Sequence, residues 1–452
     1  MTDLHTEDNT QTRFKGKKVL ILGLGVNQGG VGATKFFVKA GAQVKVTDIK
    51  NKESLASSLQ ELEEFAGIEY TLGEHKYEDL DWADLIIKNP AIKPDNPYLL
   101  YAINHDKQIE MDMGIFLQLV SPAQLIGITG TKGKSTTSTL IYEILKKSND
   151  NVIFAGNIGK SILDTVPIMN AESTIVLELS SFQLEAFALH HISPHIAVIT
   201  NIFPDHLNYY NTIEEYIEAK RLIAREQELT DYLVLRKNDT ITSSPHFQNN
   251  LVGKIIYFSP EDLPSDIQLK IPGEYNLYNA AAALAVAKIQ GIDEKDALDT
   301  IKNFSGVEYR LQLVKETNGI KIYNDSASTM PESAIWAIKS LKNSIMICGG
   351  MNKNLNYKEM AGALASDAKM IYFIDGDATD EIKKQLSAIS PQSSDKIKGT
   401  YSDLEKLLTD VKAVAKPGDT IVFSPGATSF NFFQNEFDRA RRFNTAVEKV
   451  FG

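Results

Sequence analysis

The feature that most constrains this chain is an apolar run, residues 125–129, that leads into a glycine-rich turn and then a helix. The turn reads Gly130-Thr131-Lys132-Gly133-Lys134-Ser135-Thr136. The helix is amphipathic, and one face carries Leu140, Ile141, Ile144 and Leu145. A strand that delivers such a turn to a helix N-terminus forms a phosphate cradle, because backbone N–H groups and the helix dipole face the anion. The segment therefore predicts nucleotide binding.

Two side chains of this turn have specific tasks in such a cradle. The ammonium of Lys134 adds a point charge beside the phosphates, and the hydroxyl of Ser135 is placed to ligate Mg²⁺. The usual spacing of a P-loop would put a first glycine at position 128, where this chain has Ile128. The shorter motif still stands between a strand and a helix, the context that phosphate binding requires.

The bulk composition limits the classes of protein that remain. At 452 residues the chain is too long for one core, and about three domains are expected. A net charge of −11 argues against nucleic-acid and anionic-membrane partners. The only cysteine, Cys348, rules out an intrachain disulfide. With no apolar run that could span a bilayer and no signal-peptide core, we expect a cytoplasmic protein without membrane insertion, and a monomer.

The first predicted domain, residues 1–118, begins as a Rossmann-like unit. A strand at residues 18–22 runs into Gly23-Leu24-Gly25, and a second strand ends in Asp48. This pattern resembles a dinucleotide fingerprint, but Gln28 stands where the third glycine belongs. The interpretation favours binding of a nucleotide or diphosphate, and a purely structural turn is the alternative.

The second predicted domain, residues 119–307, alternates strands and helices around the phosphate turn. One buried strand contains Glu178, and another runs out to Asn201, Asp205 and His206. A carboxylate at a strand end near a phosphate loop can be a second ligand for Mg²⁺. Alone, Glu178 would be interpreted as an exposed charge and His206 as a loop residue. Beside the phosphate loop, both are predicted to bind metal.

The third predicted domain, residues 308–452, is a further open α/β sheet. Asn318-Gly319 between two apolar runs predicts a β-hairpin. Asp325 and Ser326 are expected to cap a helix at residues 331–340. Several strands end in small or polar residues, which indicates a ligand edge at their carboxyl ends. The predicted fold is thus α/β with three domains: a Rossmann-like domain, a P-loop-type domain with a mostly parallel sheet, and a second Rossmann-like domain.

Taken together, these residues resemble the Mur ligases, the ATP-dependent amino-acid-adding enzymes of peptidoglycan synthesis. The resemblance rests on the phosphate turn, on Asn324-Asp325-Ser326, on Gly156-Asn157-Ile158-Gly159, and on Tyr216 with Lys220 one helical turn later. The segment Glu178–Glu185 is similar to that of the members that add D-glutamate to UDP-N-acetylmuramoyl-L-alanine. The similarity covers nearly the whole chain.

The resemblance implies a role for each domain. The first domain would hold the UDP group of the acceptor, the second ATP, and the third the incoming D-glutamate. Acceptor binding would fall to Gly25, Asp48, Asn157 and Ser180. ATP binding would fall to Gly130, Thr131, Lys132, Gly133, Lys134, Ser135, Thr136, Asn276, Asn279, Arg310 and Asp325. D-Glutamate binding would fall to Lys353 and Ser429, with Phe430 or Phe437 beside them.

The resemblance also implies the chemistry. The acceptor carboxylate attacks the γ-phosphate of ATP to give an acyl phosphate, and the amine of the amino acid then displaces phosphate. Two Mg²⁺ sites are implied, with Ser135 and Glu178 at one and His206 at the other. In the family, the lysine that matches Lys220 is carbamylated and becomes a further metal ligand. Lys134, His206 and Lys220 are therefore the expected catalytic residues.

Several positions depart from the family pattern. Ala327 replaces a usual lysine, Tyr309 a frequent histidine, Met351 a usual acid, and Asn89-Pro90-Ala91 a usual serine-proline-glycine. Since Ala327 and Met351 lie in the domain that would bind the amino acid, a ligase for another amino acid stays an alternative. A folylpolyglutamate synthase-like ligase, a nicotinamide dehydrogenase and a scaffold with a decayed site are further alternatives. Folylpolyglutamate synthases lack such an N-terminal domain, and Gln28 argues against a dehydrogenase because it interrupts the dinucleotide fingerprint. The intact Lys134 and Glu178 argue against a decayed site.

Overall fold

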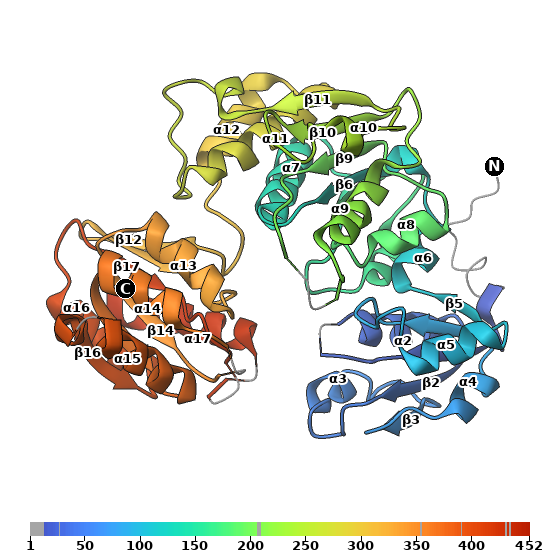
Figure 1. Ribbon diagram of the computed structural model, residues 1–452, viewed down its shortest axis with the longest axis horizontal. Coiled ribbons are helices and arrows are strands. Elements are labelled where there is room, and N and C mark those ends of the chain that lie inside the picture. Colours follow the sequence, from blue (N-terminus) through green and yellow to red (C-terminus); the bar gives the residue numbers. More distant parts are fainter. Residues whose placement is uncertain are drawn as a thin grey trace. The chain divides into compact units, whose positions relative to one another are not determined.

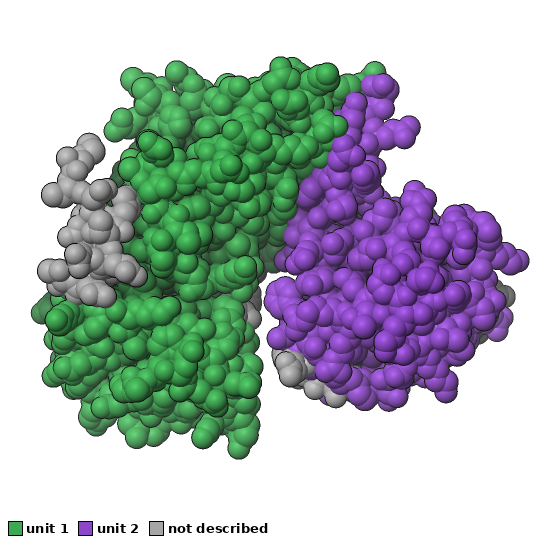
Figure 2. Space-filling model, turned by 180° about the vertical axis from the view of Figure 1, so that it is seen from behind, with its two compact units in different colours: residues 1–265, 278–300 green, residues 266–277, 301–452 purple. Residues whose placement is uncertain are grey.

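The computed structural model of the protein contains three sheets, one for each predicted domain (Figure 1). It describes residues 13–26, 28–205, 209–352, 355–389, 391–429, 432–433 and 435–452. The chain divides into two compact units (Figure 2). Unit 1 comprises residues 1–265 and 278–300, and unit 2 comprises residues 266–277 and 301–452. Among the described residues, no helix is both long and apolar enough to cross a membrane.

The first sheet has five strands, all parallel, in the order β3-β2-β1-β4-β5. The strand order reverses between β1 and β4, and in such sheets ligands bind outside the carboxyl ends of the strands at that point. The elements are β1 (Lys18–Leu22), α2 (Gly29–Lys39), β2 (Gln43–Asp48), α3 (Ala56–Gln60), β3 (Glu69–Leu72), α4 (Tyr77–Trp82), β4 (Leu85–Lys88), α5 (Pro97–Asn104), β5 (Gln108–Glu110) and α6 (Asp112–Leu117).

The second sheet has six parallel strands in the order β11-β10-β9-β6-β8-β7. Its strands are β6 (Leu125–Thr129), β7 (Val152–Gly156), β8 (Thr174–Glu178), β9 (Ile196–Ile199), β10 (Tyr232–Arg236) and β11 (Lys254–Phe258). The helices of this domain, in sequence order, are η1 (Pro122–Gln124), α7 (Lys134–Ser148), η2 (Ile162–Ile168), α8 (Leu184–Leu189), α9 (Ile213–Arg221), η3 (Leu222–Ala224), α10 (Pro245–Gln248), η4 (Pro260–Asp262), α11 (Tyr275–Ile289) and α12 (Glu294–Asn303). β6 is central and completely buried, as expected for the strand that carries the phosphate turn.

The third sheet, in unit 2, has the order β12-β13-β17-β14-β15-β16. Its strands are β12 (Gln312–Thr317), β13 (Ile320–Asn324), β14 (Ser344–Gly349), β15 (Ala368–Ile374), β16 (Ile397–Tyr401) and β17 (Thr420–Phe423). Its helices are α13 (Pro331–Ser340), α14 (Lys358–Asp367), α15 (Asp377–Ile389), η5 (Pro391–Lys396), α16 (Leu404–Val414) and α17 (Glu436–Phe451). β12 and β13 are antiparallel and are joined at Asn318-Gly319, where both residues have positive φ, so the predicted hairpin is confirmed.

One expectation about this sheet is wrong. Asp325 and Ser326 do not cap α13, because the position before the helix is Met330 and no side chain caps it. Pro331 begins the helix instead, at the first helical position, where its missing N–H costs no hydrogen bond. Asp325 and Ser326 are instead buried at the carboxyl end of β13, where their side chains take part in other contacts.

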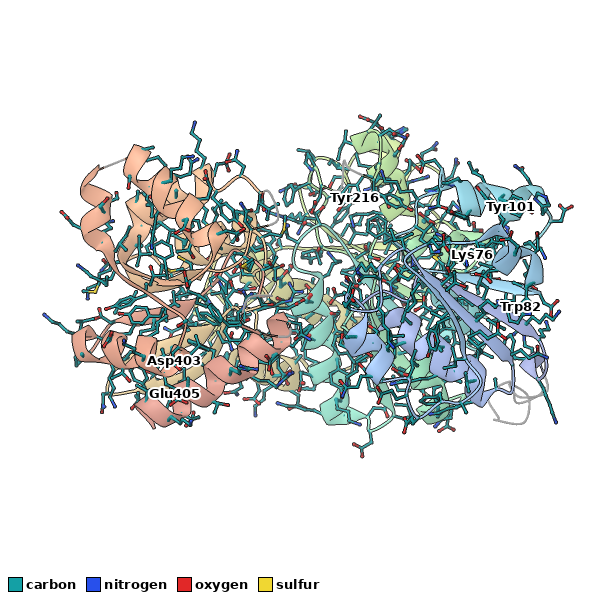
Figure 3. All side chains as sticks on the ribbon, turned by 90° about the horizontal axis from the view of Figure 1, so that it is seen from below. Lys76, Trp82, Tyr101, Tyr216, Asp403 and Glu405 are labelled. Atoms are coloured by element: carbon teal, nitrogen blue, oxygen red, sulfur yellow. The ribbon has the colours of Figure 1, made fainter. Side chains whose placement is uncertain are left out.

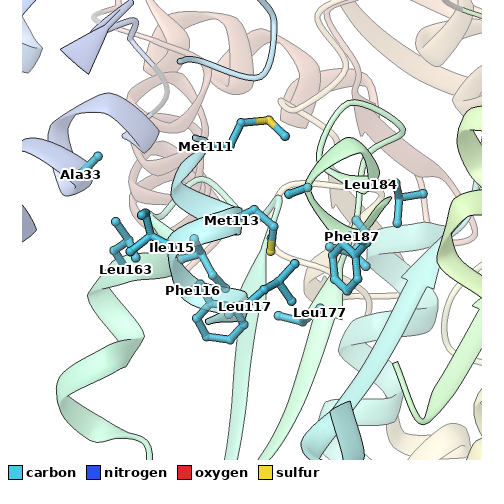
Figure 4. Packing of buried hydrophobic residues seen from close by; sticks show 14 of the residues in the cluster. Ala33, Met111, Met113, Ile115, Phe116, Leu117, Leu163, Leu177, Leu184 and Phe187 are labelled. Carbon is cyan, nitrogen blue, oxygen red and sulfur yellow. The ribbon is translucent and has the colours of Figure 1, made fainter. Parts of the chain in front are cut away.

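The first two domains share one hydrophobic core within unit 1. Met113, Phe116 and Leu117 of α6 pack beside Leu184 and Phe187 of α8 (Figure 4). Burial of this kind stabilises by about 25 cal/mol per Å² of apolar surface, so the apolar junction stabilises the contact between these two domains of unit 1. Two polar contacts cross the same junction, the ion pair Lys88–Glu185 at 3.2 Å and a hydrogen bond between His190 Nε2 and Glu110 Oε2 at 3.1 Å.

Candidate active site

The phosphate turn has the conformation that its two glycines permit. β6 ends at Thr129 and α7 begins at Lys134, so Gly130 to Gly133 form the turn. Gly130 has φ 148° and Gly133 has φ 86°, values that disfavour residues with a side chain. A Cβ at Gly130 would lie 2.0 Å from Thr200 Oγ1, and one at Gly133 would lie 2.3 Å from Asn279 Oδ1. Both glycines are therefore required by conformation and by space.

The end of β9 holds this turn in shape through its polar residues. The backbone N–H of Thr131 donates to Asn201 O at 3.0 Å, and that of Lys132 donates to Asn201 Oδ1 at 2.9 Å. The carbonyl of Lys132 accepts from Asn201 Nδ2 at 2.9 Å and from Thr200 Oγ1 at 2.6 Å. The turn is therefore pre-organised by the protein, and an anion would find it already formed.

Lys134 and Lys220 both donate to one carbonyl oxygen of the turn. Their Nζ atoms lie 3.0 Å and 2.9 Å from Gly130 O, and Lys134 also donates to Thr131 O at 3.1 Å. Lys220 is 1% exposed. Burial, followed by the nearby charge of Lys134, lowers the pKa of Lys220 well below its usual value. The site thus places two lysine side chains on one carbonyl, and burial disfavours the charged form of Lys220 relative to a lysine in water.

Helix α9 contacts the phosphate turn through Tyr216 and Lys220. Tyr216 comes from this helix (Figure 3) and is buried, and its hydroxyl shares a hydrogen bond of 3.1 Å with Thr131 Oγ1. Nζ of Lys220 lies 4.7 Å from the centre of the Tyr216 ring. The predicted common face of Tyr216 and Lys220 is confirmed, since both are buried on α9.

Glu178 is the last residue of β8 and is only 3% exposed, so the interpretation as an exposed strand-end charge is wrong. Asn157 Nδ2 donates to Glu178 Oε1 at 3.4 Å, and the N–H of Asn157 donates to Glu178 O at 2.8 Å. Ser180 lies just beyond, where its hydroxyl and its N–H each lie 3.0 Å from Gln183 Oε1. A carboxylate is thereby held beside an amide at the edge where the phosphate turn begins.

The residues at this edge fit a magnesium ion. Glu178 offers carboxylate oxygens and Ser135 a hydroxyl at the start of α7, and these oxygen ligands are of the kind that Mg²⁺ takes. Within the described ranges, no group of three or more His, Cys, Asp or Glu side chains is arranged to hold a metal. Mg²⁺ in nucleotide sites is usually held by one or two protein ligands together with phosphates and waters, so a sparse protein shell suits it.

In the first domain the structure brings together two residues expected at the acceptor site. The N–H of Gly25 donates to Asp48 Oδ2 at 2.9 Å, and the N–H of Lys50 donates to Asp48 Oδ1 at 2.9 Å. Asp48 therefore fixes the turn after β1 by accepting from two loops. Gln28, the departure from the fingerprint, precedes α2 with φ 64°, a backbone conformation that glycine would adopt more readily.

In unit 2, Asp325 is buried and tied to two neighbouring segments. Its Oδ1 accepts from the N–H of Leu311 at 3.0 Å, and its Oδ2 accepts from Ser424 Oγ at 2.6 Å. Burial raises the pKa of Asp325 to about 7, against the lowering effect of these hydrogen bonds. Asp325 thus joins the ends of β13 and β17 to the loop before β12, the loop that also contains Arg310.

Arg439 of α17 is a buried residue of this site that the sequence reasoning missed. It is 1% exposed, and its guanidinium donates to Ser326 Oγ at 3.0 Å, Ser326 O at 2.8 Å and Ala427 O at 3.0 Å. Burial lowers its pKa to about 10. A signal for it existed, because Arg439 falls on the same helical face as Phe443 and Ala446, where an apolar residue is expected.

Three family models match the chain along its length. They are the Mur ligase MurD-like N-terminal domain over residues 17–110, the Mur ligase middle domain over residues 128–263, and the Mur ligase glutamate ligase domain over residues 309–426. The chain belongs to the Mur ligase family. The three matched segments correspond to the three sheets, so the family's three-domain organisation is present.

Curated relatives within the Mur ligases match the chain from end to end. The UDP-N-acetylmuramoylalanine–D-glutamate ligase of Roseiflexus sp. strain RS-1 is 35% identical over 470 residues, covering 96% of this chain and 99% of that protein. The enzyme of the same name from Streptococcus equi subsp. zooepidemicus is 36% identical over 467 residues, covering 98% and 99%.

Solved Mur ligase structures share the fold. UDP-N-acetylmuramate-alanine ligase MurC from Thermotoga maritima has a TM-score of 0.60 at 21% identity, covering 96% of this chain and 99% of that chain. A MurF structure from Acinetobacter baumannii has a TM-score of 0.58 at 13% identity, covering 96% and 93%. At such identities the likeness concerns the fold alone.

The Mur ligase residues expected in unit 2 are only partly described. Ser429 is buried at 1% exposure, whereas Lys353 and Phe430 lie outside the described residues, as does His206 in unit 1. Phe437, the alternative to Phe430, is 43% exposed. Among the departures from the Mur ligase pattern, Ala327 donates its N–H to Tyr309 O at 3.0 Å, and Met351 exchanges backbone hydrogen bonds with Thr428.

Proposed function

We propose that this protein is the ATP-dependent ligase that joins D-glutamate to UDP-N-acetylmuramoyl-L-alanine, with release of ADP and phosphate. The observation that carries the proposal is the arrangement of Lys134 and Lys220 on the Gly130 carbonyl, beside a buried acid at the end of β8. The named relatives, which match over 96% or more of this chain, support the choice of acceptor and amino acid.

The chemistry follows from what the residues can do. A carboxylate is a poor electrophile, so the acceptor carboxylate first attacks the γ-phosphate of ATP and forms an acyl phosphate. The amine of D-glutamate then attacks the acyl carbon, and phosphate leaves. Negative charge develops on oxygens in both steps, so positioning and cations are the main contributions of the protein. Lys134 and the N–H groups at the start of α7 would hold the phosphates.

Magnesium would be held by oxygen atoms at the same edge. Ser135 and Glu178 would bind one Mg²⁺, and His206 together with Lys220 would bind a second. When bound, the ions neutralise charge on the phosphate oxygens. For Lys220 we propose carbamylation, which converts the amine into a carboxylate-like ligand. Its burial and its place beside Lys134 support this, since an ammonium would be repelled there by any added cation.

The remaining assignments are part of the same proposal. Gly25, Asp48, Asn157 and Ser180 would bind the acceptor. Asn276, Asn279, Arg310 and Asp325 would surround the nucleotide, and Lys353, Ser429 and Phe430 would hold D-glutamate. We place the domain boundaries at residues 1–118, 119–307 and 308–452. We also propose a monomer in the cytoplasm, where ATP is available.

The decisive experiment measures phosphate release with ATP, Mg²⁺ and UDP-N-acetylmuramoyl-L-alanine against a panel of D- and L-amino acids. D-Glutamate should support turnover, and the other amino acids should give background rates. Turnover with a different amino acid would favour the alternative, a Mur ligase that adds another amino acid. That alternative is kept because Ala327 and Met351 depart from the family pattern in the domain that would bind the amino acid. Phosphate release with a folate and L-glutamate, but none with the UDP-linked acceptor, would contradict the proposal.

A further inference from the structure

The carboxyl edge of the first sheet contains a crevice at the point where its strand order reverses. The crevice is formed by the ends of β1 and β4, the N-terminus of α2 and the start of α6. Its polar lining residues are Lys88, Asn89 and Asp112, and Gly23, Gly29 and Gly30 are also among the residues that line it. In sheets of this kind, such a crevice is where a nucleotide or diphosphate ligand binds.

Lys88 is the cation among the described residues that line this crevice. It is the last residue of β4, and its side chain is 11% exposed. Its Nζ donates to Glu185 Oε2 at 3.2 Å, and Glu185 Oε1 accepts from the hydroxyl of Tyr209 at 3.1 Å. Glu185 belongs to α8 in the second domain, so the ammonium is directed from the first sheet toward the domain that would hold ATP.

The ammonium of Lys88 can donate more hydrogen bonds than the one it donates to Glu185. An ammonium carries three N–H donors, and Glu185 is the hydrogen-bond partner that the described residues supply. Two donors therefore remain for a ligand. The crevice also contains the carboxyl group of Asp112, so without Lys88 its side chains would present an acid, and no cation, to an anion.

We infer that Lys88 is an acceptor-binding residue, whose ammonium contacts the diphosphate of the UDP-linked acceptor while Glu185 and Tyr209 fix its direction. This inference rests on the proposed function for the identity of the acceptor. A lysine acts on a phosphate as a point charge, and Gly29 and Gly30, the first two residues of α2, line the same crevice. Glu185, within the segment most typical of the D-glutamate-adding ligases, thereby has a role: it positions a cation of the other domain.

A purely structural role for Lys88, as a tie between domains, makes a different prediction, and the molecule supplies a matched control. His190 and Glu110 form a second hydrogen-bonded contact across the same junction, and neither lines the crevice. If Lys88 only ties the domains, His190→Ala should reproduce the effect of Lys88→Met. If Lys88 binds the diphosphate, the two variants should differ.

The test is equilibrium binding to the full-length protein by calorimetry, with UDP-N-acetylmuramoyl-L-alanine, UDP, uridine and a non-hydrolysable ATP analogue. Lys88→Met should weaken binding of the acceptor and of UDP by about tenfold to a hundredfold, the value of a hydrogen bond to a charged group. Binding of uridine and of the ATP analogue should be unchanged. Lys88→Arg should restore most of the affinity, and His190→Ala should bind all four ligands as the wild type does.

Wild-type affinity of Lys88→Met for UDP and the acceptor would overturn the inference, as would an equal loss in His190→Ala or a loss that includes the ATP analogue. Should Lys88→Met fail to fold, Lys88→Gln, which keeps a donor for Glu185 but removes the charge, is expected to show the same loss. The proposed function is tested separately by wild-type turnover. A wild type that binds the acceptor but releases no phosphate with D-glutamate would contradict the function and leave the inference standing.

Discussion

Removal of the buried guanidinium of Arg439 should strongly destabilise unit 2. Arg439→Met has a similar apolar stem, but it leaves the carbonyl oxygens of Ser326 and Ala427 without the donor that Arg439 supplies, and Ser326 Oγ keeps only its hydrogen bond to Glu436 O. Each buried acceptor left unsatisfied costs about 1–3 kcal/mol, and methionine recovers part of this by packing. We expect a loss of about 3–5 kcal/mol in the free energy of unfolding, a large share of the ~5–15 kcal/mol of a typical domain.

The two tryptophans of the chain make this measurable for unit 2 alone. Trp336 lies in α13 of unit 2, and Trp82, in the first domain (Figure 3), lies in unit 1. In a Trp82→Phe background, the fluorescence of Trp336 during urea unfolding reports unit 2. The midpoint should fall while the slope of the transition stays unchanged, because the surface exposed on unfolding is the same.

Arg442 on the same helix is the matched control. Its side chain is 55% exposed and pairs with Asp438 at 3.1 Å, so Arg442→Met should change the stability by no more than about 0.5 kcal/mol. If Arg439→Met costs less than about 1 kcal/mol, or no more than Arg442→Met, then the hydrogen bonds from Arg439 to Ser326 and Ala427 do not stabilise unit 2. That result would refute the prediction.

Three further predictions concern unit 1. Lys134→Ala should abolish phosphate release without changing the circular dichroism spectrum, because its ammonium lies on the turn; a folded variant with near-wild-type turnover would contradict the ATP site. Lys220→Ala should be nearly inactive and partly rescued by acetate or formate, and a fully active Lys220→Arg would refute carbamylation. Burial raises the pKa of Asp112 from 3.8 to about 6, so the folded state retains a proton that the unfolded chain has lost, and stability falls between about pH 4 and pH 6. Asp112→Asn should therefore raise the melting temperature more at pH 7.5 than at pH 5, and equal shifts at both pH values would exclude this explanation.

Local signals were sufficient for much of the architecture. The glycine turn at Gly130–Gly133 was predicted correctly because its left-handed conformation and the following helix depend on neighbouring residues. The hairpin at Asn318-Gly319 and the shared face of Tyr216 and Lys220 depend on short-range geometry in the same way. The family itself was also identifiable from these motifs.

The cap assignment of Asp325 and Ser326 failed for the opposite reason. Both residue types favour helix N-termini, but here distant partners compete for them: Ser424 and Leu311 for Asp325, and Arg439 for Ser326. Buried polar groups take whichever partners the tertiary fold supplies, and these partners lie up to 113 residues away in sequence.

By itself, the sequence determined the three α/β sheets, the phosphate turn and the family, since each depends on periodicity or on a contiguous motif. Only the tertiary structure decided that Glu178 is buried against Asn157, that Lys134 and Lys220 share one carbonyl, and that Lys88 of the first domain meets Glu185 of the second. Charge and burial at these positions are set by neighbours from other strands. No local pattern records which strands become neighbours, because that choice is made by the packing of the whole core.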